Sequence, residues 1–459
     1  MRRILILTLG VLRLAVAGLL VWLAWEWRSP LFASIRTPAF AALTLLPVAL
    51  AVLEIVMWRR GARWLPALLI GAITAVLAFL AVGTTLVTDL HFRWMRYQVL
   101  SADAAQVEQL GRHFIVGYRD DPSELHDLIE RRAIGGIFVT AHNVRDKDAD
   151  TVRREIDGFQ AIRKRQGLPP LLIATDQEGG AISRMSPPLQ RPTTLGDIVR
   201  AQSDPAERRK AVRAYAAEVG RSLAGLGINV NFAPVVDLDH GLNNPNDRYS
   251  RISSRAISND PKIVAEVAAD YCDGLRQHGV QCTLKHFPGL GRVFEDTHFE
   301  NASLTTTAAE LERTDWVPFR ALMGEPGMFT MLGHARLTAI DAERPASFSA
   351  PVVSGLIRGQ WKYDGILVTD DFSMAAAYEA PGGLAAASVA ALNAGVDLIL
   401  TSYDPDQYFP MVHALLRAEA AGKLKKDALS QSDRRLAGVT LEQGPQLTRA
   451  SCRSAGNSC

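Results

Sequence analysis

Hydrophobic positions follow two different patterns along the chain, and the pattern changes near residue 90. Before that point three long segments are almost entirely apolar: Ile4 to Trp27, Ala39 to Trp58, and Leu65 to Val87. Each is long enough to cross a bilayer as a helix that rises about 1.5 Å per residue. We therefore predict a membrane region over residues 1–90 with about three transmembrane helices.

Arginines border these apolar segments unevenly. Those near the N-terminus and between the second and third segments outnumber those between the first and second: Arg2, Arg3, Arg13, Arg59, Arg60 and Arg63 against Arg28 and Arg36. The positive-inside rule then places the N-terminus in the cytoplasm, and three crossings place the rest of the chain outside. We expect a multi-pass protein of the inner (cytoplasmic) membrane, with the remaining domain on the outer, periplasmic side.

A cleavable signal peptide is the competing interpretation of residues 1–27. The bulky side chains of Trp22, Trp25 and Trp27 offer no small-residue cleavage site there. The first segment is therefore expected to remain as part of an integral membrane anchor.

From about residue 100 the pattern becomes a short β-branched apolar run, a polar or glycine-containing loop, and an amphipathic helical stretch. The runs are Phe114 to Val116, Gly136 to Thr140, Leu171 to Thr175, Ile228 to Val236, Val280 to Leu284, Met328 to Leu332, Gly365 to Thr369 and Val396 to Leu400. Helical stretches such as Pro205 to Leu226 and Ala308 to Leu322 lie between them. Strands that alternate with helices indicate a parallel sheet.

Eight such units favour an α/β fold of the (β/α)8 TIM-barrel type over a doubly wound sheet, which usually has fewer strands. No GxGxxG sequence opens a helix here. We predict the barrel domain over residues 98–440. Residues 441–459 lack a periodic apolar pattern and are expected to form a disordered tail.

Composition narrows the choice of partners only slightly. The chain has 459 residues, of which 48% are hydrophobic and 21% charged, and this is ordinary for a folded protein. A formal charge of +2 indicates neither a nucleic acid nor an acidic partner.

The four cysteines lack the spacing of a metal site. Cys272 falls in a predicted helix and Cys282 in a predicted buried strand, where each is expected to be a small apolar thiol. Cys452 and Cys459 lie in the polar tail and could pair if that tail is outside the membrane.

Polar residues cluster at the predicted C-terminal ends of the strands, where a barrel gathers its catalytic groups. In chain order they are His142 and Asn143, Asp176 and Glu178, Asp237, Lys285 and His286, His334, Asp370 and Asp371, and Ser402. A single aspartate beside a strand is often a helix cap, and for Asp237 and Asp397 we keep that interpretation. A ring of such residues around one mouth favours an active site instead.

The stretch with the most candidate catalytic side chains is residues 284–298, LKHFPGLGRVFEDTH. Its apolar run ends in Lys285 and His286, and its Pro-Gly turn is followed by Asp296 and His298. Asp296 and His298 are two residues apart in a loop, so the Asp296 carboxylate can orient the His298 imidazole.

Three chemistries were compared for such a mouth. Metal-assisted hydrolysis is disfavoured because the histidines are scattered singly. Phosphate-ester chemistry needs a glycine-rich or basic cluster, and the charge of the sequence at 176–180, DQEGG, has the wrong sign for it. Glycoside hydrolysis needs a carboxylate nucleophile and a proton donor to the leaving oxygen, and both are present.

Five blocks in order along residues 105–400 resemble glycoside hydrolase family 3, in its single-domain bacterial β-N-acetylhexosaminidase branch. They are ATDQEGGAISRM (174–185), NFAPVVDL (231–238), ISSRAIS (252–258), LKHFPGLGRVFEDTH (284–298) and GILVTDDFSM (365–374). The chain departs from the family pattern at Ala181, Leu290 and Thr297. Leu290 replaces a histidine in the loop that carries His298, and this departure bears on the position of that loop or on the substrate preference.

The resemblance implies a set of roles. Asp370 would be the nucleophile, with Asp371 as its rival, and His298 would be the general acid and base, held by Asp296. The implied mechanism is a double displacement with retention through a glycosyl ester, without a metal or an organic cofactor. The residues that would bind the sugar are Asp176, Arg184, Arg255, Lys285 and His286.

The expected function is therefore an exo-glycosidase that removes a terminal β-linked N-acetylhexosamine, with N-acetylglucosamine as the expected sugar. Peptidoglycan fragments or chito-oligosaccharides are the expected carbohydrate substrates. The alternatives are a β-glucosidase or a glycoside phosphorylase of the same family, or a catalytically silent sugar-binding protein in the membrane. The sequence leaves the oligomeric state open.

Overall fold

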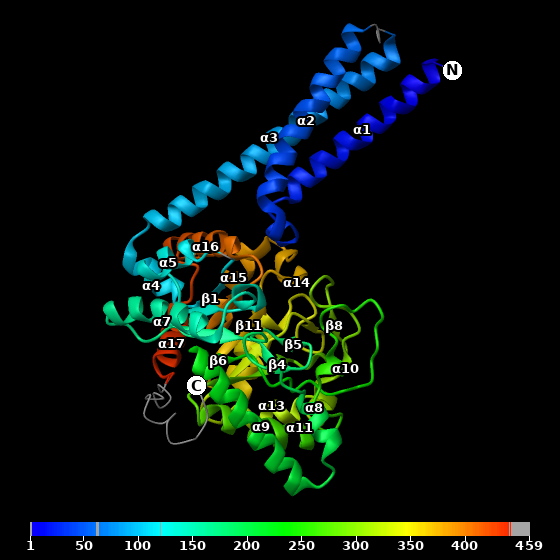
Figure 1. The fold of residues 1–459 in the computed structure, drawn as a ribbon. Coiled ribbons are helices and arrows are strands. Elements are labelled where there is room, and N and C mark those ends of the chain that lie inside the picture. Colours follow the sequence, from blue (N-terminus) through cyan, green and yellow to red (C-terminus); the bar gives the residue numbers. More distant parts are fainter. Residues whose placement is uncertain (1, 61–63, 120, 440, 442–459) are drawn as a thin grey trace. The chain divides into compact units, whose positions relative to one another are not determined.

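The computed structural model divides the chain into two compact units, residues 1–101 and 102–459 (Figure 1). It describes residues 2–60, 64–119, 121–439 and 441. Most of the predicted tail at 441–459 lies outside the described residues, and so does the suggested pairing of Cys452 with Cys459.

The first unit contains three long apolar helices: α1 (Arg2–Glu26), α2 (Arg36–Arg59) and α3 (Leu65–Ser101), with a 3-10 turn at Pro30–Ile35. Each is long and apolar enough to cross a membrane. Inside this unit Arg13 of α1 forms an ion pair of 2.6 Å with Glu54 of α2. An ionised side chain in an apolar setting needs such a partner, so this pair fixes the first two helices together.

The second unit is a closed barrel of eight parallel strands in the order β1-β12-β11-β9-β7-β6-β3-β2. Each strand falls within or overlaps one predicted apolar run, so the predicted (β/α)8 barrel is confirmed. The strands are β1 (Phe114–Gly117), β2 (Gly136–Phe138), β3 (Leu172–Thr175), β6 (Val230–Asn231), β7 (Gln281–Phe287), β9 (Met328–Leu332), β11 (Leu367–Asp371) and β12 (Leu398–Thr401).

Helices surround this barrel (Figure 1). The longer ones are α4 (Ala104–Gly111), α5 (Ser123–Glu130), α7 (Ala149–Arg165), α9 (Pro205–Leu226), α11 (Pro261–Arg276), α15 (Gly383–Ala394), α16 (Tyr408–Ala420) and α17 (Lys426–Ala437), with a π-helix at Pro351–Gln360. Short elements at the loops include β4 (Gln177–Gly179), β5 (Ile182–Ser183), α10 (Ile252–Arg255) and α14 (Ala375–Tyr378).

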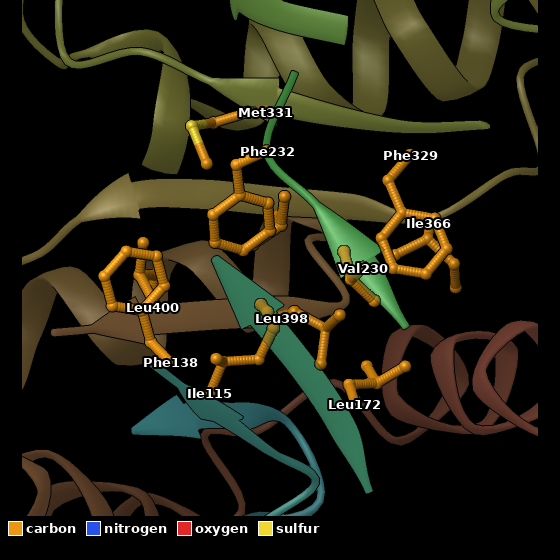
Figure 2. Close-up of a cluster of buried hydrophobic side chains, with 12 residues drawn as sticks. Ile115, Phe138, Leu172, Val230, Phe232, Phe329, Met331, Ile366, Leu398 and Leu400 are labelled. Carbon is orange, nitrogen blue, oxygen red and sulfur yellow. The ribbon is translucent and has the colours of Figure 1, made fainter. Parts of the chain in front are cut away.

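Alternate side chains of the strands fill the barrel interior (Figure 2). Phe329 and Met331 come from β9, and Leu398 and Leu400 from β12, so each of these strands contributes residues two apart. Leu436, in the last turn of α17, packs against this core. The interior is therefore a packed core, and the chemistry is left to the strand ends.

Local sequence explains where the helices begin and end. The side chain of Asp204 caps α9 by accepting hydrogen bonds from the Ala206 and Glu207 amides, and Gly227 ends that helix at φ +88°. The predicted single helix from Ala308 to Leu322 is wrong. It is broken into α12 (Ala308–Leu311) and α13 (Val317–Leu322), because Pro318 lacks an amide proton and fits only the first turn of a helix.

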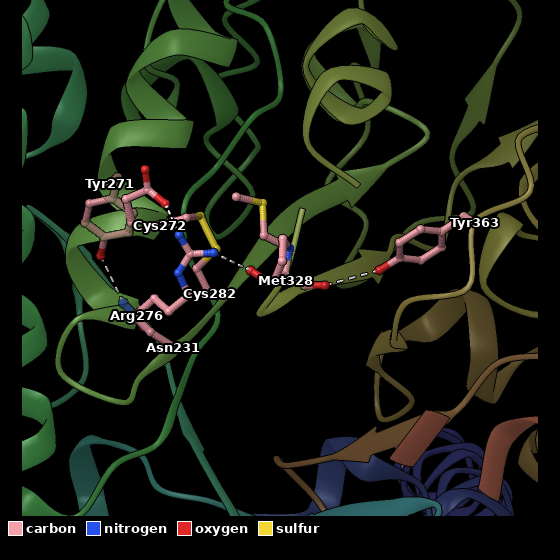
Figure 3. Close-up of a disulfide and its surroundings, with 9 residues drawn as sticks. Asn231, Tyr271, Cys272, Arg276, Cys282, Met328 and Tyr363 are labelled. Carbon is pink, nitrogen blue, oxygen red and sulfur yellow. Dashed lines mark hydrogen bonds and ion pairs between the residues drawn. A yellow bond between two sulfur atoms is a disulfide. The ribbon is translucent and has the colours of Figure 1, made fainter. Parts of the chain in front are cut away.

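The prediction that Cys272 and Cys282 are separate apolar thiols is also wrong. The two form a disulfide with a Cα–Cα distance of 5.5 Å (Figure 3). Cys272 lies on α11 and Cys282 on β7, so the bond joins a helix to the strand that carries Lys285 and His286. The chain turns back on itself between α11 and β7, so the two cysteines meet although they lie on different elements.

Candidate active site

Two cations and two carboxylates meet at the C-terminal ends of β3 and β7. The Lys285 ammonium lies 2.7 Å from Asp176 Oδ1 and 2.5 Å from Glu178 Oε1. The Arg255 guanidinium, at the end of α10, donates to both oxygens of Glu178 at 2.9 and 2.7 Å. Three elements far apart in sequence are thus joined by ionic hydrogen bonds.

The charges in this cluster stabilise one another. Burial alone would raise the pKa of Glu178, but the charges of Arg255 and Lys285 outweigh it and hold that pKa well below its usual range. Burial would lower the pKa of Lys285, but the charges of Asp176 and Glu178 outweigh it, and the pKa of Lys285 is raised. Glu178 and Lys285 therefore stay ionised. Glu178 was placed at a strand end by the sequence but was not among the predicted site residues.

Asp237 does not cap a helix, contrary to the sequence-based interpretation. It is almost fully buried and accepts hydrogen bonds from the backbone amides of His286 and Leu290, and from His286 Nδ1 at 2.8 Å. His286 therefore has Nδ1 occupied, and its Nε2 faces Arg255 Nη2 at 3.5 Å. Asp237 is a positioning residue for that imidazole.

Asp397 is not a helix cap either. It precedes β12 at the opposite end of the barrel, where Arg358 and Arg435 donate to its carboxylate at 2.7 and 2.8 Å. Its Oδ2 also accepts from the Leu367 amide at 2.8 Å. This carboxylate stabilises the N-terminal ends of the strands and lies outside the mouth.

The loop after β7 brings Asp296 and His298 together as predicted from their spacing. His298 Nδ1 lies 2.8 Å from Asp296 Oδ1, and the His298 amide donates to the same oxygen at 3.1 Å. Burial would raise the pKa of Asp296, but the hydrogen bonds from His298 outweigh it and lower that pKa. Asp296 is 2% exposed and His298 39%. With Nδ1 committed to the carboxylate, Nε2 is the nitrogen left for a substrate.

The glycines of this loop are required by its close packing. A Cβ atom at Gly291 would lie 1.9 Å from the Leu238 carbonyl oxygen, and Gly289 has φ +105°. Between them Leu290 is buried against Ile252, Ala302 and Ala335. The residue that departs from the family pattern therefore stabilises the base of the loop.

A shift in register separates the two neighbouring aspartates of β11. Its pairing with β12 is displaced between Val368 and Asp371, and such irregularities redirect side chains. The Asp371 carboxylate accepts from Ser373 N at 2.8 Å, Tyr403 N at 2.9 Å, and both the amide and the hydroxyl of Ser402. It is fully engaged in holding the neighbouring loop.

Asp370 is in a different environment. Its Oδ1 accepts from the Asp371 amide at 2.8 Å. Burial would raise the pKa of Asp370, but the imidazoles of His286 and His298 and the hydrogen bond from the Asp371 amide outweigh it and lower that pKa. The carboxylate therefore stays ionised and available at the floor of the mouth.

The loop that carries His298 docks beside this carboxylate. The Ala375 amide, which lies just beyond β11, donates to the His298 carbonyl oxygen at 3.1 Å. His334 also lies beside Asp370. Its Nε2 lies 3.0 Å from the Asp371 carbonyl and its Nδ1 2.7 Å from Ser347 Oγ, while burial lowers its pKa. A neutral His334 satisfies both contacts.

Arg184 follows β5, and its amide donates to the Asp176 carbonyl at 2.9 Å. Within the described part of the chain its guanidinium has no hydrogen bond or ion pair, so it is available to a ligand. No group of three or more His, Cys, Asp or Glu side chains in the same described ranges is arranged to hold a metal ion. The structure thus brings together four of the residues that the sequence assigned to sugar binding, Asp176, Arg255, Lys285 and His286, and it places the backbone of Arg184 beside Asp176.

Comparison with known proteins gives concordant matches. Residues 99–439 match the glycosyl hydrolase family 3 N terminal domain. The beta-hexosaminidase of Alkalilimnicola ehrlichii is 34% identical over 287 residues, which cover 62% of this chain and 78% of that protein.

Two solved structures are similar to the barrel unit. A glycoside hydrolase family 3 beta-N-acetylglucosaminidase from Paenibacillus sp. has a TM-score of 0.66 and 28% identity, covering 77% of this chain and 64% of that one. A beta-N-acetylhexosaminidase from Beutenbergia cavernae has a TM-score of 0.64 and 30% identity, covering 73% and 98%.

Proposed function

The chain belongs to glycosyl hydrolase family 3, and from that premise we propose that it is a retaining β-N-acetylhexosaminidase that removes terminal N-acetylglucosamine. The names of its relatives support the sugar. One observation carries the chemistry: an ionised Asp370 and the His298–Asp296 pair converge on the same mouth.

In the first step an Asp370 oxygen attacks C1 of the sugar, and the bond from C1 to the glycosidic oxygen breaks. His298 Nε2 gives its proton to that oxygen, so the leaving group departs as an alcohol. The result is a glycosyl ester on Asp370 and a neutral imidazole. The Asp296 carboxylate stabilises the imidazolium before the transfer, because it accepts the Nδ1 proton at 2.8 Å.

In the second step water attacks C1 of the ester from the face that the leaving group vacated. His298 takes a proton from that water, the bond from C1 to Asp370 breaks, and the carboxylate is restored. Two inversions at C1 give net retention. An imidazole suits both steps because it gives and takes a proton near neutral pH.

The ionic cluster would hold the sugar. The Asp176 carboxylate accepts from Lys285 through one oxygen and can accept from a sugar hydroxyl. The Arg184 guanidinium and the Nε2 of His286 would add further polar groups for the sugar. Because Lys285 and Arg255 are fixed by Glu178, these donors and acceptors need little reordering when a sugar binds.

The full-length protein in detergent tests this function. We expect hydrolysis of a chromogenic β-N-acetylglucosaminide, little hydrolysis of the matching β-glucoside, and no dependence on added phosphate. Asp370→Asn should lower kcat by about three decades or more, because the covalent nucleophile is lost. A phosphate requirement would favour the phosphorylase, and absence of turnover would favour a sugar-binding protein.

The neighbouring aspartate supplies the matched control. Asp371→Asn replaces a carboxylate that accepts four hydrogen bonds, so it should lower the free energy of unfolding by about 1–3 kcal/mol. The Asp371→Asn protein should still form the glycosyl ester on Asp370. Full activity in Asp370→Asn with loss in Asp371→Asn would reverse the assignment.

We also propose that the catalytic domain faces the periplasm, where peptidoglycan fragments or chito-oligosaccharides would be its substrates. Three apolar helices and the distribution of arginines support this placement. The Cys272–Cys282 disulfide supports it independently, because such bonds persist in oxidising compartments. Protease added to intact spheroplasts should digest the catalytic domain, whereas a domain protected until lysis would contradict the placement.

A further inference from the structure

The exposed large apolar side chains of the barrel unit are not scattered. Among its described residues they all lie on loops that follow β6, β7 or β12, at the C-terminal end of the barrel. They are Leu242, Tyr249, Phe294, Phe299 and Tyr403. Single exposed apolar residues are normal, so the informative feature is which of these five lie in contact with one another beside the mouth.

Two of these rings lie next to the proposed general acid. The Tyr249 ring is 5.4 Å from the His298 ring between centroids, and the Phe299 ring is 5.4 Å from Tyr249. Tyr249 is 53% exposed and Phe299 50%. The rings therefore form a continuous aromatic surface that begins at His298 and remains open to solvent.

The same carboxylate positions this surface and the acid. Asp296 orients His298 through Oδ1 and accepts from the Tyr249 amide through Oδ2 at 3.2 Å. The Asn244 side chain also donates to the Phe294 carbonyl at 2.8 Å, which joins the loop after β6 to the loop after β7. The ring of Tyr249 is thus held in a fixed place relative to the imidazole.

We propose that Tyr249 and Phe299 form a leaving-group subsite that stacks on the next pyranose ring of an oligosaccharide. This inference rests on the proposed function, because a general acid must contact the glycosidic oxygen. The bound terminal sugar lies on the Asp370 side of that oxygen. An aromatic surface adjoining the acid and open to solvent is placed to contact what departs.

The chemistry of the two rings selects the ligand. One face of a pyranose carries mainly C–H groups, which pack well against an aromatic face. The preferred substrates are therefore sugar chains with at least one further pyranose ring beyond the cleaved bond. Substrates with a small leaving group gain nothing from this surface.

Two substrates separate binding of the leaving group from the chemical step. N,N′,N″-triacetylchitotriose presents two pyranose rings on the leaving side, whereas methyl β-N-acetylglucosaminide presents only a methyl group, and both leaving groups are unactivated alcohols that need the general acid. In the full-length protein, Tyr249→Ala and Phe299→Ala should each lower kcat/KM for the trisaccharide by about tenfold. The value for the methyl glycoside should change by less than about twofold, and Tyr249→Phe should keep the wild-type preference.

Phe294→Ala is the matched control. Phe294 lies on the same loop and is 54% exposed, but the structure gives its ring no contact with His298 or Tyr249. It should leave both substrates unaffected. Equal losses on both substrates in Tyr249→Ala would mean that the ring only supports His298, and unchanged kinetics on both would mean that the rings serve another contact. Either result overturns the subsite.

Failure of the proposed function gives a different result. A wild-type protein that hydrolyses neither the methyl glycoside nor the trisaccharide would remove the glycosidase activity and the subsite with it. A wild-type protein that hydrolyses both, with no selective loss in either alanine variant, would remove the subsite alone.

Discussion

At the residue scale, two neighbouring aspartates of β11 have opposite environments. The Asp371 carboxylate accepts hydrogen bonds from Ser373 and from the loop after β12. The Asp370 carboxylate accepts one from the Asp371 amide and lies among three histidines. Strand alternation predicts that only one of them faces the mouth but not which one. The register shift in β11 decides the matter, and it depends on pairing with a distant strand.

His298→Ala should affect substrates according to their leaving groups. With an unactivated aglycone, kcat/KM should fall by about two to four decades, because proton donation is lost. With 2,4-dinitrophenolate as leaving group the first step needs no proton, so its rate should change by only a few fold. Pre-steady-state release of the phenolate measures that step, and an equal loss for both aglycones would exclude His298 as the acid.

At the element scale, the site depends on loops that three separate elements bring together. β4 supplies Glu178, β7 supplies Lys285, and α10 supplies Arg255. Each of these elements is short or irregular, and their mutual contacts define the cluster. The electrostatics of the cluster therefore contribute to stability as well as to binding.

Stability should depend on pH through Glu178. Its pKa is lower in the folded state than in the unfolded chain, so the unfolded state binds more protons and stability rises with pH in that window. The contribution is complete above the unfolded pKa of about 4.3 and is lost as pH falls below it. Urea unfolding from pH 3 to pH 7 should show a shallower acid loss in Glu178→Gln than in the wild type. Glu300→Gln, an exposed carboxyl on the same face, should retain the wild-type slope.

Much of the fold follows from the sequence, but less of the site does. The period of apolar runs located the strands and helix α9, since burial and capping are local signals. The Cys272–Cys282 bond and the role of Asp237 were missed, because each depends on residues that meet only after folding. The break at Pro318 is a local signal, since a proline fits only the first turn of a helix, and the apolar pattern of the segment concealed it. The pairing of Asp296 with His298 was accessible, since both lie in one short loop.

At the scale of the whole molecule, every residue assigned here to chemistry or sugar binding lies in the unit of residues 102–459. That unit has its own packed interior, the barrel core of Figure 2. The three apolar helices add no group to the mechanism. The proposed anchoring and the proposed catalysis are thus assigned to different units of one chain.

A fragment of residues 102–459 tests this separation. It should be soluble and retain kcat/KM for a chromogenic β-N-acetylglucosaminide within about threefold of the full-length protein in detergent, because the barrel buries its own core. Circular dichroism should show cooperative thermal unfolding. A folded fragment without activity would place part of the active site in the first unit.

The central claim is that Asp370 forms a covalent bond to the sugar. Incubation of the full-length protein with 5-fluoro-β-N-acetylglucosaminyl fluoride slows breakdown of that ester, and mass spectrometry of a proteolytic digest then locates it. The account predicts one fluorosugar on the peptide with the bond at Asp370, and no label in Asp370→Asn. A label on Asp371, or turnover with no labelled carboxylate, would contradict it.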